Sequence, residues 1–198
     1  MTLRNITCAV TLCLLTLSGQ AVGKTEVPPY KNKSLSIEKR VDDLMGRMTL
    51  REKVLQLQNR GAGRLDEIDR IFNGESYGCT HEMGTTAAEC ATMYKELQQY
   101  MLTKTRLGIP IITSAEGIQG ILQNNCTLFP HALAQGSTFN PALIQRMTEA
   151  AGEEAKVIGI HQILSPVLDI ARELRWGRVE ETFGEDPFLV GQMGAATV

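Results

Sequence analysis

A dense group of charged side chains follows a short apolar segment near the end of the chain. The apolar segment, residues 161–168, is expected to form a buried strand that ends at the charges beyond it. Residues 169–186 then contain six acidic residues, three arginines and Trp176, the only tryptophan of the chain. Charges at this density are costly to desolvate unless they pair with one another or with a ligand. The group therefore has the composition of the wall of a polar binding site.

The composition as a whole indicates a globular protein. The chain has 198 residues, of which 43% are apolar, and this is enough for a hydrophobic core. The net charge of -2 gives no electrostatic attraction to nucleic acid or to an anionic membrane surface. His81 and His131 have no partner at metal-ligand spacing, and the sequence contains no Walker loop, CxxC pair or HExxH motif. The sequence therefore gives no indication of a nucleotide, zinc or nucleic-acid site.

The first residues have the features of a secretory signal peptide. Arg4 supplies a positive charge, residues 8–17 are an apolar run too short to span a bilayer, and small residues precede Lys24. A short buried helix is the alternative, but the abrupt change to polar sequence at Lys24 favours export. We predict a signal peptide over residues 1–23, a tether over residues 24–35, and a secreted or periplasmic protein without a membrane anchor.

Hydrophobic periodicity predicts alternating helices and strands over the remaining residues. Helices are expected from Ile37, from the capping box at Thr49, from Thr85 or Thr86, from Pro141 and from Pro187. Short strands are expected at residues 109–112, 131–135 and 161–168, and a loop at residues 61–84. This order is typical of parallel β/α construction, although the pattern alone does not separate an open sheet from a (β/α)8 barrel.

The charged group also carries a resemblance to a known family. Arg175-Trp176-Gly177-Arg178, then Glu180-Glu181, then Gly184-Glu185-Asp186-Pro187 resemble the signature of the N-terminal domain of glycoside hydrolase family 3, the group of β-glucosidases and β-xylosidases. Upstream motifs resemble the same family in the same order: RLGIP at residues 106–110, Glu116 followed by Gly120, Phe129-Pro130, and TFNP at residues 138–141. The resemblance covers the predicted domain, residues 36–198.

The resemblance implies a fold and a reaction. The first domain of this family is a (β/α)8 barrel, and such barrels need about 250 residues. Residues 36–198 are therefore expected to be the first part of a TIM-type barrel that is incomplete in this chain. The implied protein is an exo-acting retaining β-glycosidase that acts on oligosaccharides or on aryl or alkyl β-glycosides and needs no metal or organic cofactor. The alternative is a noncatalytic carbohydrate-binding fragment or an inactive truncated product.

The resemblance assigns no catalytic residue within the chain. Retaining glycosidases use two carboxyl groups that lie about 5 to 5.5 Å apart. The nucleophilic aspartate and the acid/base of the family are both expected beyond Val198. The acids of the signature loop, such as Glu180 and Glu185, are expected to hold arginines in place instead.

The resemblance does assign residues to sugar binding. Arg178 matches the family residue that donates to hydroxyls of the terminal sugar, for which the fixed fork of a guanidinium is suited; the alternative is an ion pair with a neighbouring acid. Glu116 matches an acid that accepts from the same sugar, and its extra methylene relative to aspartate favours pentosides such as β-xylosides. Gln119 stands where many relatives carry histidine, and an amide can also donate and accept. Trp176 is either a stacking platform for a sugar face or a packing anchor beneath the loop.

Overall fold

The structure, a computed structural model, describes residues 27–81 and 86–198. The chain divides into two compact units, Met1–Arg47 and Met48–Val198. The predicted signal peptide, residues 1–23, lies outside the described residues and stays a prediction.

The first unit contains a short 3-10 helix and one amphipathic helix. The helix η1 spans Pro29–Lys31, and α1 spans Ile37–Arg47, starting at the residue that the sequence predicts. The backbone N–H of Tyr30 donates to the Asp43 carboxylate at 3.2 Å, and Arg47 Nε donates to the same carboxylate at 2.8 Å. Part of the predicted tether therefore packs on α1, and its boundaries stay a prediction.

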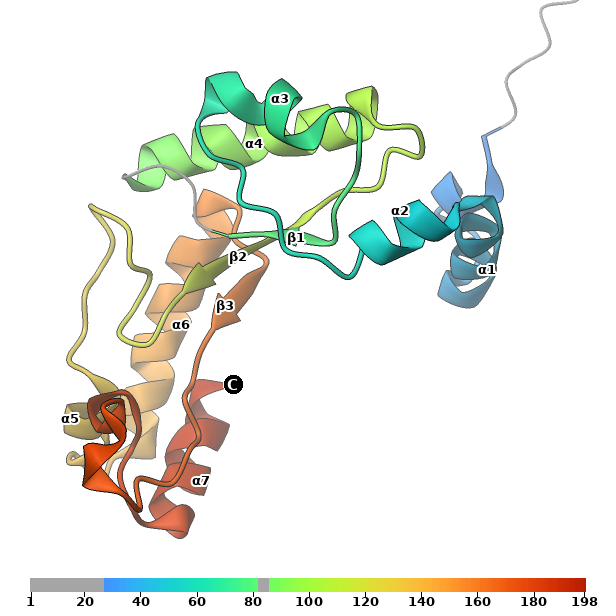
Figure 1. The fold of residues 1–198 in the computed structure, drawn as a ribbon. Helices are drawn as coiled ribbons and strands as arrows, with labels where there is room; N and C mark the ends of the chain where they lie inside the picture. Colours follow the sequence, from blue (N-terminus) through green and yellow to red (C-terminus); the bar gives the residue numbers. More distant parts are fainter. Residues whose placement is uncertain (1–26, 82–85) are drawn as a thin grey trace, which may run out of the picture. The chain divides into compact units, whose positions relative to one another are not determined.

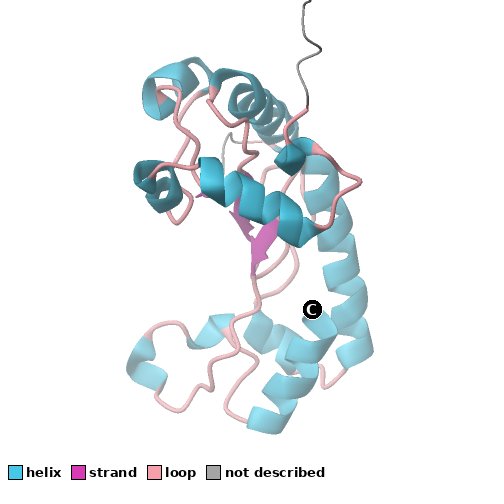
Figure 2. Ribbon diagram, turned by 90° about the vertical axis from the view of Figure 1, so that its right-hand side faces the viewer, coloured by secondary structure: helices cyan, strands magenta, loops and turns pink. Residues whose placement is uncertain are grey.

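The second unit is built on a parallel sheet (Figure 1). Its three strands are β1 (Cys79–Thr80), β2 (Ile112–Glu116) and β3 (Gln162–Leu164), in the order β1-β2-β3. The helix α4 (Ala87–Lys104) connects β1 to β2, and α6 (Pro141–Ile158) precedes β3. Figure 2 shows the strands in magenta among these helices. Parallel strands joined by helical crossovers are the construction that the sequence predicts.

The other helices of this unit are shorter. They are α2 (Leu50–Leu55), η2 (Leu65–Glu67), α3 (Ile68–Phe72), α5 (Ala132–Gly136), η3 (Leu174–Trp176), η4 (Val179–Glu181) and α7 (Pro187–Thr197). Among residues 27–81 and 86–198, no helix combines the length and the hydrophobicity that crossing a membrane requires.

The predicted starts of α2, α4, α6 and α7 are confirmed, and side-chain caps explain them. Thr49 and Thr86 each form a capping box, at the start of α2 and of α4 respectively. Asn140 and Asp186 cap α6 and α7 with their side chains, each directly before a proline. These caps satisfy N–H groups that the first turn of a helix leaves without a partner.

Two hydrophobic clusters form the core of the second unit. In the first cluster, Phe72, Leu97 and Met101 from α3 and α4 are fully buried. In the second cluster, Ile144 of α6 and Met193 of α7 are fully buried. The apolar stripes that the sequence predicts for α4 and α6 therefore do face the interior.

The loop predicted at residues 61–84 is wrong, because this segment contains η2, α3 and β1. The helix α3 has 5 residues and β1 has 2, so neither is long enough to produce a periodic pattern. The strand exists because Cys79 and Thr80 pair with Ile112 and Thr113 of β2, which is a contact distant in sequence.

The strand predicted at residues 109–112 is displaced, since β2 runs over Ile112–Glu116. Pro110 has no N–H to donate to a strand ladder, and pairing begins only after it. Thr113 and Ser114 are buried and satisfied; the Thr113 hydroxyl, for example, donates to a carbonyl at 2.6 Å. These buried hydroxyls interrupt the apolar pattern and hide the strand.

The strand predicted at residues 131–135 is wrong, because the chain forms the helix α5 there. A short apolar run does not distinguish strand from helix, and alanine, leucine and glutamine all favour helix. The Gln135 side chain donates to the Pro130 carbonyl at 2.7 Å, which closes the turn onto the preceding loop.

The last predicted strand, residues 161–168, is shortened to β3, and the predicted burial is wrong. Among the described residues β3 pairs only with β2, so one edge has no neighbouring strand, and Leu164 is exposed. The peptide bond between Ser165 and Pro166 is cis, and the strand ends before it.

Candidate functional site

The carboxyl ends of β1 and β2 bring two titratable side chains together. Glu116 is the last residue of β2, whereas the strand predicted at residues 109–112, the first in the prediction, would place it beyond a strand end; the structure corrects this, and β2 is the second strand of the chain. His81 follows β1 directly, and its Nε2 lies 3.7 Å from Glu116 Oε1. Both side chains are partly exposed, with 35% and 40% of their surface open to solvent.

The buried Ser114 connects His81 to the sheet. Its hydroxyl donates to the Thr80 carbonyl at 2.8 Å and lies 3.3 Å from His81 Nδ1. The register Thr80↔Thr113 places the ends of the two strands side by side, because parallel strands end at the same edge of a sheet. The imidazole is therefore held at that edge beside Glu116.

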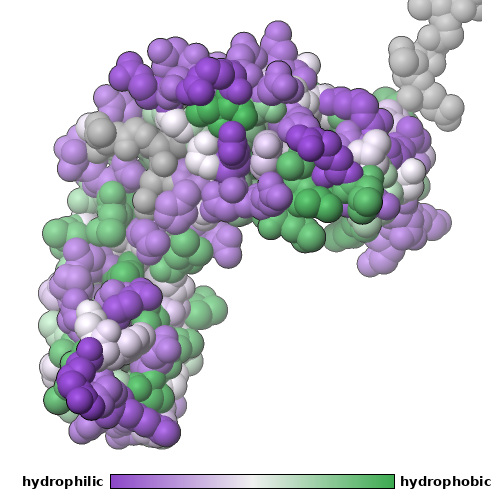
Figure 3. All heavy atoms as spheres, viewed as in Figure 1, coloured by the Kyte–Doolittle hydropathy of each residue, from purple (hydrophilic) through white to green (hydrophobic). Residues whose placement is uncertain are grey.

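The loop after β3 folds back on itself and carries the charged group of the sequence. A β-bridge joins Val167 to Thr182, and the Ala171 N–H donates to the Gly184 carbonyl at 3.1 Å. Between η3 and η4 lies Gly177 with a φ of 88°, a left-handed conformation that favours glycine. Figure 3 shows strongly hydrophilic side chains over this loop. The glycine thus sets the turn between Trp176 and Arg178.

Arg178 forms the local ion pair that the sequence leaves open as an alternative to sugar binding. Its Nε donates to Glu181 Oε1 at 2.9 Å, and an Nη donates to the other carboxylate oxygen. A guanidinium has five N–H donors, and these bonds use two of them. The hydrogen bond to Arg178 lowers the pKa of the Glu181 carboxyl. The pair orients the guanidinium without using all of its donors.

The charges around Arg178 link it to the end of β2. The hydrogen bond to Glu181, and then its charge, raise the pKa of Arg178, and the charges of Asp169 and Glu116 add to this increase. The structure therefore places Arg178 within electrostatic reach of Glu116, although the two residues come from different loops of the sheet edge. Among the predicted sugar-binding residues in the described part of the chain, Glu116 and Arg178 are the pair for which an electrostatic interaction is found.

Gln119 lies in the loop after β2, and its position is fixed by the backbone. Its carbonyl accepts from the Phe129 N–H at 2.8 Å. At the next residue, Gly120, a Cβ would lie 2.3 Å from the Thr127 carbonyl oxygen, so the loop depends on glycine. Within residues 27–81 and 86–198, no hydrogen bond joins the Gln119 side chain to Glu116 or Arg178.

Trp176 is 41% exposed and lines an open hollow together with Asp169, Ile170, Arg172 and Glu173. The neighbouring Arg175 binds Glu173 through its Nε at 2.9 Å. This bond, and the Arg175 backbone N–H, lower the pKa of Glu173 to about 2. The exposure of the indole is what stacking on a sugar would require, whereas a packing anchor would be buried.

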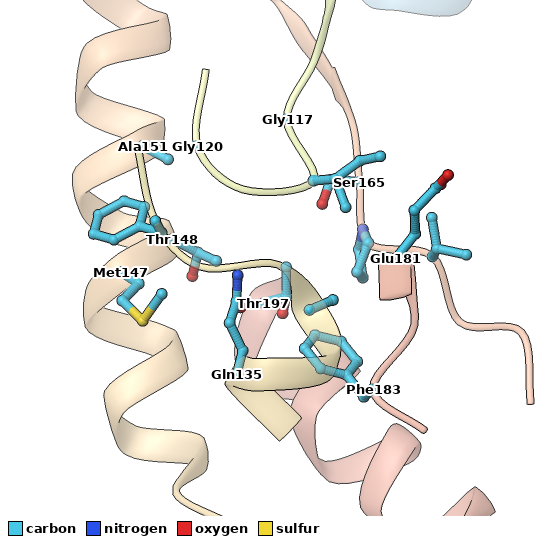
Figure 4. Close-up of a pocket in the computed structure, with 15 residues that line it drawn as sticks. Gly117, Gly120, Gln135, Met147, Thr148, Ala151, Ser165, Glu181, Phe183 and Thr197 are labelled. Carbon is cyan, nitrogen blue, oxygen red and sulfur yellow. The ribbon is translucent and has the colours of Figure 1, made fainter. Parts of the chain in front are cut away.

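A small cavity lies beneath this loop, between α6 and the strand ends (Figure 4). Its volume of about 30 Å³ has room for about one or two water molecules and none for a sugar ring. Gln135, Thr148 and Ser165 line it, and Figure 4 shows the Glu181 side chain directed away from Thr148. The cavity therefore belongs to the packing of the loop, and the candidate site is the exposed edge beside it.

The site contains residues that the sequence alone does not identify. His81 and Ser114 gain their places from the pairing of β1 with β2, and β1, with 2 residues, is too short to leave a pattern in the sequence. No group of three or more metal-ligating side chains is present in the described part of the chain.

Comparison with known proteins identifies the family. Residues 49–198 match the Glycosyl hydrolase family 3 N terminal domain. A β-xylosidase of Formosa agariphila is 39% identical over 109 residues, which are 52% of this chain and 15% of that protein. A periplasmic β-glucosidase/β-xylosidase of Dickeya chrysanthemi is 30% identical over 190 residues, which are 83% of this chain and 28% of that protein.

Solved structures agree with this match. The crystal structure of a β-glucosidase from Listeria innocua in complex with glucose superposes with a TM-score of 0.67 and 30% identity over 81% of this chain and 23% of that one. The chain thus spans less than a third of the length of each of these relatives. The α/β fold predicted from the sequence, the first part of a TIM-type barrel, is confirmed. The chain belongs to glycosyl hydrolase family 3, through the N-terminal domain of that family.

Proposed function

We propose that this chain is the first part of a longer, exo-acting retaining β-glycosidase that hydrolyses β-glucosides or β-xylosides. The observation that carries the proposal is that Glu116, at the end of β2, lies close enough to Arg178, in the loop after β3, for its charge to act on the guanidinium. The carboxyl ends of barrel strands are where enzymes of this fold hold their substrates. At that edge the Glu116 carboxylate can accept hydrogen bonds from the hydroxyl groups of a terminal sugar, and the Arg178 guanidinium can donate several to them.

Each of the two residues has a distinct part in the proposed site. Arg178 is oriented by Glu181 and donates its remaining N–H groups to adjacent sugar hydroxyls. Glu116 accepts a hydroxyl proton, and bonds of this kind to a charged group are stronger than neutral ones. Gln119 and Trp176 complete the proposed site as an amide contact and a stacking surface.

The bond-breaking groups of the proposed enzyme are not assigned to this chain. A retaining mechanism needs a carboxylate nucleophile and a second carboxyl group that acts as acid and then as base. Both are expected beyond Val198. The described residues therefore bind and orient the sugar, and chemistry depends on the rest of the complete protein.

Similar proteins support a sugar as the ligand, and they support the proposed cellular location. The Listeria innocua β-glucosidase was crystallised with glucose, and the Dickeya chrysanthemi relative is periplasmic. Together with the predicted signal peptide at residues 1–23, the latter supports a secreted or periplasmic location for the proposed enzyme.

The sugar-binding role of Arg178 is tested in the complete protein. We expect Arg178→Ala to lower kcat/KM for p-nitrophenyl β-xyloside and β-glucoside by about 10- to 100-fold, because it removes charged hydrogen bonds to the substrate. Arg175→Ala is the matched control, since Arg175 lies in the same loop and, among residues 27–81 and 86–198, its side chain binds its neighbour Glu173 alone. Equal kinetics for wild type and Arg178→Ala would place the sugar elsewhere.

The alternative is a noncatalytic carbohydrate-binding protein of the same fold. The reading frame after Val198 distinguishes it from the enzyme. A Lys-His pair followed by an aspartate at a strand end favours the enzyme. A stop codon at that point, together with binding of glucose or xylose without hydrolysis, favours the binding protein.

Substrate preference rests on the length of Glu116. A glutamate reaches one methylene farther than an aspartate and would occupy space that the C6 hydroxymethyl group of a glucoside needs. We therefore expect a higher kcat/KM for p-nitrophenyl β-xyloside than for the β-glucoside, and Glu116→Asp to reduce that preference. A clear preference of the wild type for the glucoside contradicts this assignment.

A further inference from the structure

We propose that Cys90 and Cys126 form a disulfide bond that fastens the loop after β2 to α4. The chain has 5 cysteines, and two of them lie in the predicted signal peptide. Cys79, Cys90 and Cys126 remain, and the structure holds all three as thiols. Disulfides form in oxidising compartments, so the inference rests on the proposed secreted or periplasmic location and is independent of the sugar-binding site. An odd number of thiols leaves one over, and we assign that position to Cys79.

Backbone contacts bring the two cysteines to the same place. A parallel β-bridge joins Thr86 to Asn124, and the Ala87 N–H donates to the Asn124 carbonyl at 3.1 Å. Cys90 comes one helical turn after Thr86, and its N–H donates to the Thr86 carbonyl at 2.9 Å. Residues three and four positions apart share one face of a helix, so Cys90 lies on the face of α4 that begins at these contacts. Cys126 follows Asn124 by two residues, a span of at most about 7 Å.

Both side chains contribute to the first hydrophobic cluster. Cys90 is fully buried within it, and Cys126 is partly buried and packs against it. The loop is also held by α6: the Thr127 N–H donates to both carboxylate oxygens of Glu154 at 3.1 Å, and the Thr127 hydroxyl donates to one of them at 2.7 Å. The loop around Cys126 is therefore fixed to α4 on one side and to α6 on the other.

The protonation of Cys126 indicates when the bond forms. Burial raises the pKa of this thiol, and the charges of Glu154 and Cys90 raise it further. Because interactions between charges weaken with distance, the effect of Cys90 agrees with the proximity that the backbone contacts require. The thiolate is the attacking species, and a raised pKa makes it scarce in the folded protein. We therefore expect the bond to form while the chain folds and to persist afterwards.

The reaction needs a disulfide as the oxidant, either oxidised glutathione or a disulfide oxidoreductase. The Cys126 thiolate attacks one sulfur of the oxidant, which forms a mixed disulfide and releases one thiol of the oxidant. The Cys90 thiolate then attacks the Cys126 sulfur and releases the second thiol, so that two electrons and two protons pass from the cysteines to the oxidant. The product closes a loop of about 35 residues, which restricts the unfolded chain and so stabilises the fold.

Peptide mapping without reduction tests the pairing in the complete protein. The protein is refolded with oxidised and reduced glutathione, and the remaining thiols are blocked. It is then cleaved with trypsin and a glutamate-specific protease, because Glu82 and Glu89 separate Cys79 from Cys90 in the sequence. We expect one cross-linked pair of peptides that contains Cys90 and Cys126 and that separates on reduction.

Cys79→Ala and Cys126→Ala are the matched variants. Cys79→Ala should keep the cross-link, whereas Cys126→Ala should lose it and leave Cys90 as a thiol. Reduction with dithiothreitol should lower the urea concentration at the unfolding midpoint by about 1 M more in the wild type and in Cys79→Ala than in Cys126→Ala.

Blocked thiols at both Cys90 and Cys126, a cross-link of either one to Cys79, or a cross-link between two copies of the chain would overturn the proposal. A cross-link would also overturn it if its reduction shifted the midpoint of the wild type no more than that of Cys126→Ala, because such a bond does not fasten the loop. Cell fractionation tests the location separately. If glutathione produces the cross-link but the protein stays in the cytoplasm, the proposed location fails and the pairing stands.

Discussion

At the amino ends of the strands, charged residues bind one another across long stretches of sequence, whereas at the carboxyl ends the charged contacts are local or loose. Before β1 and β2, Arg51 Nε donates to Glu75 Oε1 at 2.5 Å, and Arg106 Nε donates to Glu52 Oε1 at 2.8 Å. These pairs join residues that are 24 and 54 positions apart. They tie the segments that lead into the strands to α2.

After the strands the arrangement is different. Arg178 pairs with a residue only 3 positions away, and the His81 and Glu116 side chains lie 3.7 Å apart. At the amino end the charges thus hold distant segments of the chain together, whereas at the carboxyl end the side chains of His81, Glu116 and Arg178 are partly exposed to solvent. Barrel enzymes divide stability and function between the two ends in this way. The same kind of substitution should therefore have different effects at the two ends.

The largest expected effect tests the close packing of the amino end. Gly78 lies directly before β1, and a Cβ at this position would be 1.9 Å from the Gln56 carbonyl oxygen. We expect Gly78→Ala to lower the free energy of unfolding by about 3 kcal/mol or more, because rotation of a side chain cannot relieve a clash with backbone. The urea concentration at the unfolding midpoint measures this change.

Gly61→Ala is the control for this substitution. No atom lies within 4 Å of the position that its Cβ would take, so we expect a change within about 0.5 kcal/mol. If the unfolding midpoint of Gly78→Ala equals that of the wild type, the backbone at Gly78 does not lie as close to the Gln56 carbonyl as the structure shows.

An identical change at the two ends separates binding from stability. We expect Glu116→Gln, at the carboxyl end, to lower kcat/KM for p-nitrophenyl β-xyloside by about 10-fold or more, because a neutral amide is a weaker acceptor than a carboxylate. Its unfolding midpoint should change little. Glu52→Gln, at the amino end, should leave kcat/KM unchanged and lower the free energy of unfolding by about 1 kcal/mol, because it removes the charge pair with Arg106.

Two outcomes would contradict the expected difference between these two variants. If Glu52→Gln lowers kcat/KM as much as Glu116→Gln does, the two ends of the strands are not functionally distinct. If Glu116→Gln lowers the unfolding midpoint as much as Glu52→Gln does, Glu116 is a structural residue and the sugar site lies elsewhere.

The parts of the fold that could be predicted from sequence are those whose stabilising contacts are local. Thr86, Asn140 and Asp186 cap helices whose first turns follow them directly, so the signal and the contact lie within a few residues. The strand β1 could not be predicted, because two residues become a strand only through pairing with Ile112 and Thr113. The helix α5 was wrongly predicted as a strand for the related reason that five residues fit either structure.

The residues of the candidate site also fall into two groups: those that a local sequence motif indicates, and those that are placed by contacts distant in sequence. Glu116 and Arg178 stand in motifs that can be recognised in the sequence, although their electrostatic coupling depends on the loop that the Val167–Thr182 bridge folds back. The pairing of Arg178 with Glu181 was foreseen only as an alternative. His81 could not be placed at all, because its position beside Glu116 is set by the register of two strands, one of which has no sequence pattern.

The smallest expected effect is a pH dependence confined to the amino end. The hydrogen bond from Arg106 lowers the pKa of Glu52 to about 2, and the N–H and hydroxyl of Thr49 contribute further. Since the folded carboxyl has a lower pKa than the unfolded one, it stabilises the fold above the ordinary carboxyl pKa of about 4.3, and this contribution is lost as the pH falls toward about 2. The Arg106 side chain is 55% exposed, so solvent screens the pair and we expect a total loss of at most about 1 kcal/mol.

Glu52→Gln isolates this contribution, because glutamine is also accepted at the third position of a capping box and keeps the bond to Thr49. The difference in free energy of unfolding between wild type and Glu52→Gln should therefore shrink as the pH falls from about 5 to about 2, and it should be constant above that range. A difference that persists undiminished at low pH would mean that Glu52 acts through packing or capping. The cross-link from α2 to the segment before β2 would then not be electrostatic, and the contrast between the two ends of the strands would have to rest on backbone packing at Gly78 alone.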